Sequence, residues 1–293
     1  MEALGASELG DVLCNQDAEI GPRMRAVFFL RTLGTDEALD YLAKGLSIKG
    51  DSVLLRHETA YVLGQMQNDR VIPVLASILS NVEDDPVVRH EAAEAIGAIG
   101  HLESLALIEK YTSDERPEVS ETCKIAAKRL RWLADNSSGN VPCEYDTIDP
   151  APPLDSSTSL EEAVSQLLNV DIPLFVRYQA MFFLRNMGGE DAVLGLAKGL
   201  KDSSALFRHE IAYVLGQMAH EASVPGLQSC LEDLDEHGMV RHEAAEALGA
   251  VGNSKCVEIL RRFSDDPEPL VSESCVTALD SVDYWEDFEK TNE

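Results

Sequence analysis

An internal duplication constrains the fold of this chain more than any other feature. The string Phe-Phe-Leu-Arg at residues 28–31 returns at 182–185. Arg-His-Glu and the Tyr-Val-Leu-Gly-Gln-Met that follows it, residues 56–66, return at 208–218. Self-similarity at this scale indicates that the chain folds as two related halves.

A shorter period runs through each half. Aligned anchor positions recur at intervals of 31 or 33 residues, at 23, 56, 89 and 120 and at 177, 208, 241 and 272. Apolar residues follow each anchor at helical spacing, as Ala60 and Leu63 do after Arg56. The period is shorter than the ~40 residues of long HEAT repeats, and the Trp and Tyr pattern of tetratricopeptide repeats is absent. We therefore predict an all-α fold, an α-solenoid of eight short HEAT-like helical-hairpin repeats in two duplicated four-repeat halves.

Local signals predict where some helices start and how they pack. Asp85-Pro86 and Asp266-Pro267 each combine an acidic cap with proline at the first helical position, so both predict a helix start. Gly97 and Gly249 lie inside helical patterns. Close packing between stacked helices is the expected reason for both glycines.

A change of composition divides the chain. Residues 136–159 hold four prolines and many serines, which predicts an extended linker between an N-terminal half, residues 1–135, and a C-terminal half, residues 160–293. Ser159-Leu160-Glu161-Glu162 predicts a capping box that restarts helix after the linker. We expect the halves to swing on this linker until they face each other.

Charge and cysteine content limit the partners and the compartment. The chain has 24 Lys plus Arg against 52 Asp plus Glu, a net charge of −28, so we expect neither nucleic acid nor an anionic membrane as a partner. A basic partner is compatible with this charge, although solubility alone is a sufficient cause. No basic leader and no apolar run of roughly 20 residues is present. Six scattered cysteines without a Cys-x-x-Cys pair indicate reduced thiols and a cytoplasmic protein, with Cys123 and Cys275 as small buried residues.

Four Arg-His-Glu motifs occupy the middle two repeats of each half, and they begin at Arg56, Arg89, Arg208 and Arg241. The outer repeats replace His-Glu by other pairs, such as Met24-Arg25 and Tyr178-Gln179. The repeat therefore folds without His and Glu, which favours a functional role for the motif. An isolated pair such as His220-Glu221 is better interpreted as surface, together with His101 and His237. The arginines continue into repeats without His, which favours ion pairing between repeats.

The repeat geometry favours a metal site. Equivalent residues on stacked helices lie about 8–10 Å apart, and two histidines leaning together can share an ion at about 2.1 Å each. Each half then offers two histidines, His57 with His90 or His209 with His242, and at least one carboxylate. Two histidines and one carboxylate leave positions open on non-haem Fe(II). The two halves would present two such sets face to face.

One turn beyond each histidine, the same helix face carries another polar residue. These residues are Tyr61, Glu94, Tyr213 and Glu246. At this spacing they can support a ligating histidine or line the cavity. Packing between helices is an equally good reason for the two tyrosines.

The duplicated HEAT-like halves with four His-Glu motifs resemble the deoxyhypusine hydroxylase family. The resemblance covers roughly residues 20–135 and 160–280. It implies a non-haem di-iron enzyme with two Fe(II) ions and O2 as co-substrate. Such an enzyme hydroxylates the deoxyhypusine side chain in the precursor of translation initiation factor 5A, the last step of hypusine formation. An electron donor, which the sequence does not identify, would be a further partner.

The resemblance also implies roles for the motif residues. One iron would be held by His57, His90 and Glu91. The other would be held by His209, His242 and Glu243. Glu58 and Glu210 would then face the substrate or the outer shell. Because deoxyhypusine is a polyamine-like cation, surplus carboxylates could hold its ammonium groups and place the reacting carbon.

Two other functions remain open from the residues alone. HEAT-like solenoids often serve as protein-binding scaffolds, in which case the His-Glu pairs would be contact residues. A zinc metallohydrolase could use the same ligands, because two histidines and a glutamate also suit Zn²⁺.

Overall fold

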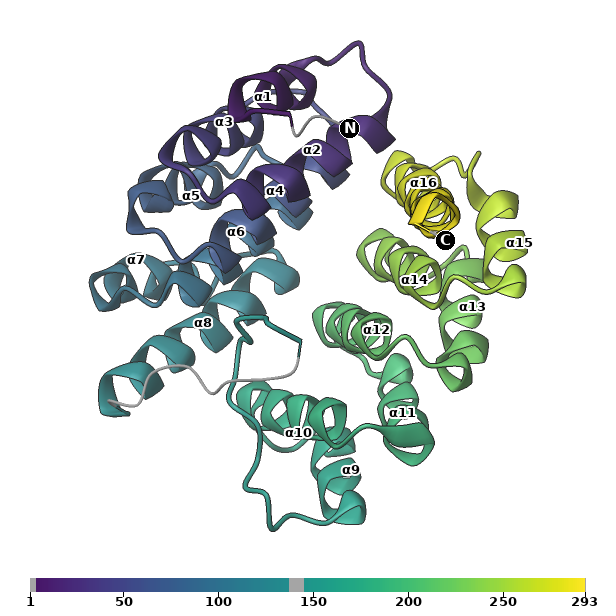
Figure 1. The fold of residues 1–293 in the computed structure, drawn as a ribbon. Helices are drawn as coiled ribbons and strands as arrows, with labels where there is room; N and C mark the ends of the chain where they lie inside the picture. The colour runs from purple at the N-terminus through teal and green to yellow at the C-terminus, as the bar shows by residue number, and fades with distance from the viewer. Residues whose placement is uncertain (1–3, 137–144, 293) are drawn as a thin grey trace. The chain divides into compact units, whose positions relative to one another are not determined.

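The structure is a computed structural model that describes residues 4–136 and 145–292, with side chains up to residue 285. The chain divides into two compact units, Met1–Asn140 and Val141–Glu293. All regular structure in the described residues is helical, as predicted, with sixteen α-helices (Figure 1). Within the described residues, no helix has the length and apolar character needed to cross a membrane.

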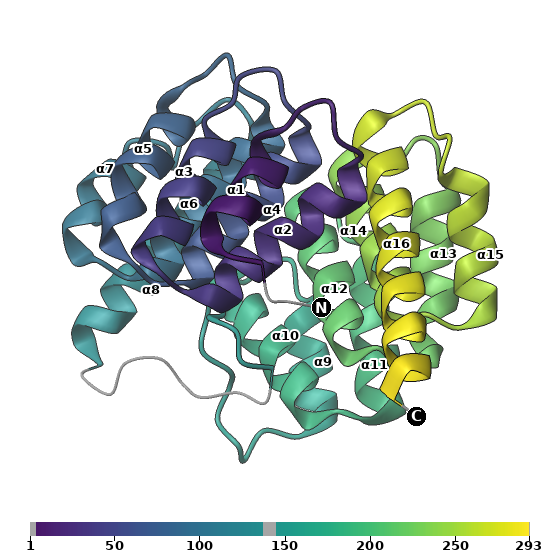
Figure 2. The ribbon, with the colours of Figure 1, turned by 45° about the horizontal axis from the view of Figure 1, so that its top comes forward.

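The first unit contains α1 (Ala6–Cys14), α2 (Ile20–Leu33), α3 (Asp36–Leu46), α4 (Val53–Gln65), α5 (Ile72–Ser80), α6 (Pro86–Ile99), α7 (Leu105–Glu109) and α8 (Pro117–Asp135). The second contains α9 (Leu160–Leu168), α10 (Leu174–Met187), α11 (Gly189–Ala197), α12 (Ala205–Met218), α13 (Val224–Glu232), α14 (Gly238–Val251), α15 (Ser254–Phe263) and α16 (Pro269–Asn292). Short 3-10 turns lie at Asp69–Val71, Leu102–Ser104, Lys198–Lys201 and Glu221–Ser223. Consecutive helices pair as antiparallel hairpins. In each unit the odd-numbered and even-numbered helices form separate layers (Figures 1 and 2). The predicted α-solenoid class is confirmed.

The predicted helix starts have different outcomes. Asp85 caps α6 by accepting a hydrogen bond from the Val87 amide at 2.8 Å, and Pro86 opens the helix, as predicted. The capping box at Ser159 is also confirmed, because Ser159 and Glu162 exchange hydrogen bonds. The start predicted at Asp266-Pro267 is wrong, since α16 begins at Pro269. The Asp266 carboxylate instead pairs with Arg241 at 2.5 Å.

Even-numbered helices approach each other closely at glycines. A Cβ added to Gly97 would lie 2.9 Å from the Ala126 Cβ, and one on Gly249 would lie 2.7 Å from the Ala278 Cβ. Close packing as the reason for these two glycines is therefore confirmed. The same contact occurs at Gly64 and Gly216, which face Ala95 and Ala247. Each of these four glycines lies seven residues after a motif histidine, and therefore on the same helix face.

Arginines that recur at one register connect successive repeats. Arg56 donates through Nε to the Leu46 carbonyl at 3.0 Å and through both Nη atoms to Asp84 at 2.6 and 2.7 Å. The equivalent ion pairs are Arg23–Asp51, Arg89–Asp114, Arg177–Asp202, Arg208–Glu236 and Arg241–Asp266. Each arginine reaches an acid in the loop before the second helix of the following repeat. Ion pairing between repeats is confirmed as the role of these arginines.

The predicted linker, residues 136–159, is partly packed onto the second unit. Residues 137–144 lie outside the described residues. Residues 145–155, which we call the linker strap, are non-helical and pack on α10, where the Leu154 amide donates to the Gln179 carbonyl at 3.2 Å. Ala151 is buried. This part of the linker is therefore fixed to the second unit.

Candidate metal centre

The four His-Glu pairs lie near the N-terminal ends of α4, α6, α12 and α14. Their eight side chains are buried, with at most 7% of any of these residues exposed. The arginine before each pair is fixed by its ion pair to the next repeat, which sets the rotation of the helix. His and Glu at consecutive positions point about 100° apart, so they address different neighbouring helices.

In the first unit, two histidines face each other across α4 and α6. The ring centroids of His57 and His90 are 5.4 Å apart, and His57 Nε2 lies 3.3 Å from the Glu91 carboxylate. Donor atoms of His90, Glu91 and Glu94 lie within 4.8 Å of one another. The close Gly64 contact, two turns further along α4, holds the helices near enough for this arrangement.

The second unit repeats the geometry on α12 and α14. The ring centroids of His209 and His242 are 5.3 Å apart, and His209 Nε2 lies 3.2 Å from the Glu243 carboxylate. Donor atoms of His209, His242 and Glu243 lie within 4.8 Å of one another. The histidine pair and its glutamate contact therefore occur in both units, whereas the grouped donor atoms include Glu94 in the first unit and a second histidine in the second.

The contacts of three motif glutamates differ in a way that the sequence alone did not show. Glu91 and Glu243 lie against the histidine of the preceding even-numbered helix. Glu58 instead contacts the Nδ1 atom of His57, its neighbour in sequence, at 2.9 Å. The preceding even-numbered helices, α2 and α10, carry Met24 and Tyr178 at the histidine register. This register difference is visible in the sequence once the layer of even-numbered helices is known.

Comparisons with known proteins agree with this architecture. The model of the PBS lyase HEAT-like repeat matches residues 55–81, 88–114, 176–202, 207–233 and 240–266. Deoxyhypusine hydroxylase of Danio rerio is 50% identical over 280 residues, 94% of this chain and 91% of its own length. The Homo sapiens enzyme is 47% identical over 278 residues, 94% of this chain and 90% of its own length. A structure of human deoxyhypusine hydroxylase in complex with glycerol matches with a TM-score of 0.92 and 46% identity, over 95% of this chain and 96% of that one.

The chain belongs to the deoxyhypusine hydroxylase family. The resemblance inferred from the motifs is therefore confirmed. Within this family member, two imidazoles and a carboxylate gather in each unit, which is a donor set that suits Fe(II) or Zn²⁺. The residues present fit a metal ion in each unit.

The electrostatics of the first unit also suit a cation. Burial by itself would lower the pKa of His57, but hydrogen bonds to Glu58 and Glu91 and their charges raise this pKa well above its usual value. The same carboxylates would attract a divalent cation to this position. The Glu58 and Glu91 carboxylates therefore favour a positive charge beside His57.

The residues one turn beyond the histidines lie beside these groups. Glu94 belongs to the first group. The Glu246 carboxylate lies 3.7 Å from His242 Nδ1, and the Ser274 hydroxyl donates to Glu246 at 3.4 Å. Tyr213 accepts a hydrogen bond from Gln217, and Tyr61 is half-buried on α4.

The three remaining histidines lie outside the two groups. His101 and His237 are exposed, and His220 is partly exposed. The Nδ1 atoms of His220 and His237 accept backbone hydrogen bonds at helix starts. Their interpretation as surface residues agrees with these positions.

Proposed function

We propose that this chain hydroxylates the deoxyhypusine side chain of the translation initiation factor 5A precursor, with O2 as co-substrate and two Fe(II) ions, one in each unit. The supporting observation is a histidine Nε2 that lies 3.2–3.3 Å from a glutamate carboxylate in both units, with the ring of a second histidine 5.3–5.4 Å from the first. Relatives that are 44–50% identical over nearly all of this chain carry the name deoxyhypusine hydroxylase.

The proposed iron ligands are His57, His90 and Glu91 in the first unit, with His209, His242 and Glu243 in the second. Two imidazoles and one carboxylate on each ion leave coordination positions open for other ligands. When bound, the irons would supply the O2 activation that an unactivated C–H bond requires. The chain itself contributes the geometry, because the arginine ion pairs and the glycine contacts fix the four ligand-bearing helices.

Glu58 and Glu210 are the proposed substrate contacts. Both carboxylates are buried, with 7% and 2% exposed, and each lies one residue from a proposed ligand. Charge-assisted hydrogen bonds to the ammonium groups of deoxyhypusine would place the reacting carbon. The net charge of −28 favours the approach of a basic substrate loop.

Neighbouring polar groups would orient the proposed ligands. Glu94 and Glu246 would hold the ring orientation of His90 and His242, as hydrogen-bond partners of ligating histidines commonly do.

One atom of O2 enters the product hydroxyl and the other leaves as water, so a separate electron donor must supply the electrons. We also expect a cytoplasmic location, because the cysteines of the described residues are free thiols.

Mass spectrometry of the substrate tests the proposed reaction. The purified protein is loaded with Fe(II) and given O2, a reductant and deoxyhypusine-bearing translation factor 5A. The substrate should gain one oxygen atom. His57→Ala and His242→Ala should abolish this gain and reduce bound iron while circular dichroism remains unchanged. His101→Ala, at an exposed histidine, is the matched control and should behave as the wild type.

Other outcomes would favour other functions. Native zinc without oxygen transfer would point to a metallohydrolase, and a wild type that binds no metal would leave a scaffold. Global unfolding of the His→Ala variants would show that the histidines are structural.

The division among the glutamates has its own test. Glu58→Ala or Glu210→Ala should weaken substrate binding more than iron binding. Glu91→Ala or Glu243→Ala should release iron, because these carboxylates lie at the opposing histidine. Equal iron loss in all four variants would contradict this division between iron ligands and substrate contacts.

A further inference from the structure

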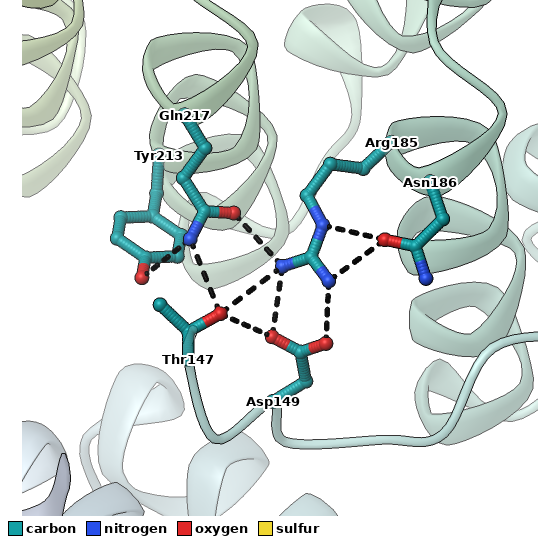
Figure 3. A network of polar contacts seen from close by, with 6 residues as sticks. All are labelled: Thr147, Asp149, Arg185, Asn186, Tyr213 and Gln217. Carbon is teal, nitrogen blue, oxygen red and sulfur yellow. Dashed lines mark hydrogen bonds and ion pairs between the residues drawn. The ribbon is translucent and has the colours of Figure 1, made fainter. Parts of the chain in front are cut away.

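A polar network connects the linker strap to α10 and α12 within the second unit (Figure 3). Arg185 of α10 is fully buried, and its guanidinium donates to the two carboxylate oxygens of Asp149 at 2.8 and 2.6 Å. The guanidinium also lies 4.7 Å from the ring centroid of Tyr145 and 4.9 Å from that of Phe182. A cation this deeply buried requires its counter-charge, so Asp149 fixes the strap on α10.

Gln217 extends the network from Arg185 to Tyr213. Arg185 Nη1 donates to Gln217 Oε1 at 2.9 Å, so the amide oxygen faces the cation and the amide nitrogen faces away from it. This nitrogen donates to the Tyr213 hydroxyl at 2.9 Å. Because the phenol oxygen accepts that bond, its own proton is available to donate elsewhere. The buried charge of Arg185 therefore sets Tyr213 as a hydrogen-bond donor.

Tyr213 lies next to a proposed metal ligand. It is one helical turn beyond His209 on α12, where side chains four residues apart are neighbours about 5–6 Å apart at Cβ. The residue is half-buried. Gly216 holds α12 against Ala247 of α14 in the following turn, so the helix that carries both residues is tightly placed. Tyr213 and His209 therefore lie on the same face of α12, and the Gln217 amide holds the Tyr213 hydroxyl.

The first unit provides an internal comparison. The duplication places Arg31, Tyr61 and Gln65 at the positions of Arg185, Tyr213 and Gln217. Arg31 is partly exposed, whereas Arg185 is fully buried. Phe28 is 38% exposed, whereas its counterpart Phe182 is fully buried. The duplicated sequence therefore does not give the two arginines the same environment, and the strap contributes to the difference.

We propose that Asp149 of the linker strap, acting through Arg185 and Gln217, positions the Tyr213 hydroxyl as a hydrogen-bond donor beside His209 in the second unit. Asp149, Arg185 and Gln217 are positioning residues that do not touch the reacting atoms. The contribution to turnover rests on the proposed function, whereas the orientation of Tyr213 does not. The network makes the two halves unequal although their motifs are identical.

Fluorine NMR of protein labelled with 3-fluorotyrosine tests the orientation without any assay of activity. The Tyr213 resonance is assigned from its loss in Tyr213→Phe. Asp149→Ala and Gln217→Met should both shift this resonance. Asp155→Ala is the matched control, because Asp155 is an exposed acid of the same strap whose carboxylate bonds to Ser157, and it should leave the resonance in place. An unmoved Tyr213 resonance in Asp149→Ala would overturn the proposal.

A double-mutant cycle on turnover tests whether the strap acts through Tyr213. Asp149→Ala and Tyr213→Phe should each lower kcat by about tenfold, the effect of one lost hydrogen bond in the transition state. The double variant should be no slower than either single variant, because both changes break one chain of contacts. Effects that multiply in the double variant would show that Asp149 does not act through Tyr213, and would overturn the proposal.

The same variants separate a failure of this proposal from a folding defect and from a failure of the proposed function. If Asp149→Ala fails to fold by circular dichroism, Gln217→Met decides the question, because it keeps the Asp149–Arg185 ion pair and removes the amide that bonds to Arg185, Thr147 and Tyr213. If the wild type does not hydroxylate deoxyhypusine, the proposed function fails. The fluorine resonance alone then decides whether the strap positions Tyr213.

Discussion

Replacing Gly64 by Ala tests whether helix packing sets the distance between the proposed ligands. A Cβ at this position would lie 2.6 Å from the Ala95 Cα, whereas ordinary contact begins at 3.4 Å, so α4 and α6 must separate by about 0.8 Å. Overpacking costs about 1–3 kcal/mol, and the better helix propensity of Ala returns about 1 kcal/mol. We expect a net loss of roughly 1 kcal/mol in the free energy of unfolding.

The effect on metal binding should exceed the effect on stability. Metal–ligand distances tolerate only about 0.2 Å of displacement, so a shift several times larger at His57 and Glu91 should release the iron of the first unit. Gly216→Ala, whose Cβ would lie 3.0 Å from the Ala247 Cα, should weaken the second site less. Gly45→Ala is the control, because its Cβ would meet only the end of the Leu13 side chain.

Iron content after Fe(II) loading and urea denaturation are measured on the same preparations. Gly64→Ala should bind less iron than the wild type while it remains helical, and Gly45→Ala should bind as much as the wild type. Full iron binding by Gly64→Ala would refute the argument that this contact holds the ligands in place.

Three further predictions follow from the ion pairs and the thiols. Arg89→Met breaks a buried ion pair and should lower the free energy of unfolding by about 3 kcal/mol. Arg70→Met removes a largely exposed ion pair and should lower it by less than about 1 kcal/mol. Equal losses in urea denaturation would contradict this difference. Burial alone would raise the pKa of Asp114, but the hydrogen bond from Arg89 lowers it, so its carboxylate stabilises the fold above about pH 4 and this contribution is lost as pH falls through the lowered pKa. In Asp114→Asn the free energy of unfolding should therefore fall less steeply as the pH is lowered below about 4. An unchanged pH dependence would count against the Arg89–Asp114 pairing. Burial raises the pKa of Cys123 and Cys275 to about 12, so both should stay unmodified by iodoacetamide at about pH 8 until the protein unfolds; mass spectrometry showing modification of the folded protein would contradict this.

The fold could be predicted from the sequence because its determinants are local or repeated. Apolar residues at helical spacing and the repeated anchors specify the hairpins, and Asp85-Pro86 marks a helix start by its own side chain. Asp266-Pro267 has the same local signal, but Arg241 in the preceding repeat engages that carboxylate and the helix starts at Pro269. Only the folded arrangement decides whether the Asp266 carboxylate bonds to Arg241 or caps the helix.

The candidate site could be predicted only in part. The motif register indicated which histidines gather, and both units bring them together. Which glutamate meets a histidine depends on the neighbouring helix, where Met24 stands opposite the first motif of its half. The role of Arg185 could not be predicted, because Arg31 follows the same Phe-Phe-Leu and only the distant Asp149 gives Arg185 its charged partner.

Iron content measured after anaerobic loading and desalting tests the central claim most directly. The wild type should retain one iron in each unit. His209→Ala should retain only the iron of the first unit, and the variant that combines His57→Ala with His209→Ala should retain none, all with unchanged helical circular dichroism. A combined variant that keeps the iron of the wild type would contradict the assignment of these histidines as ligands.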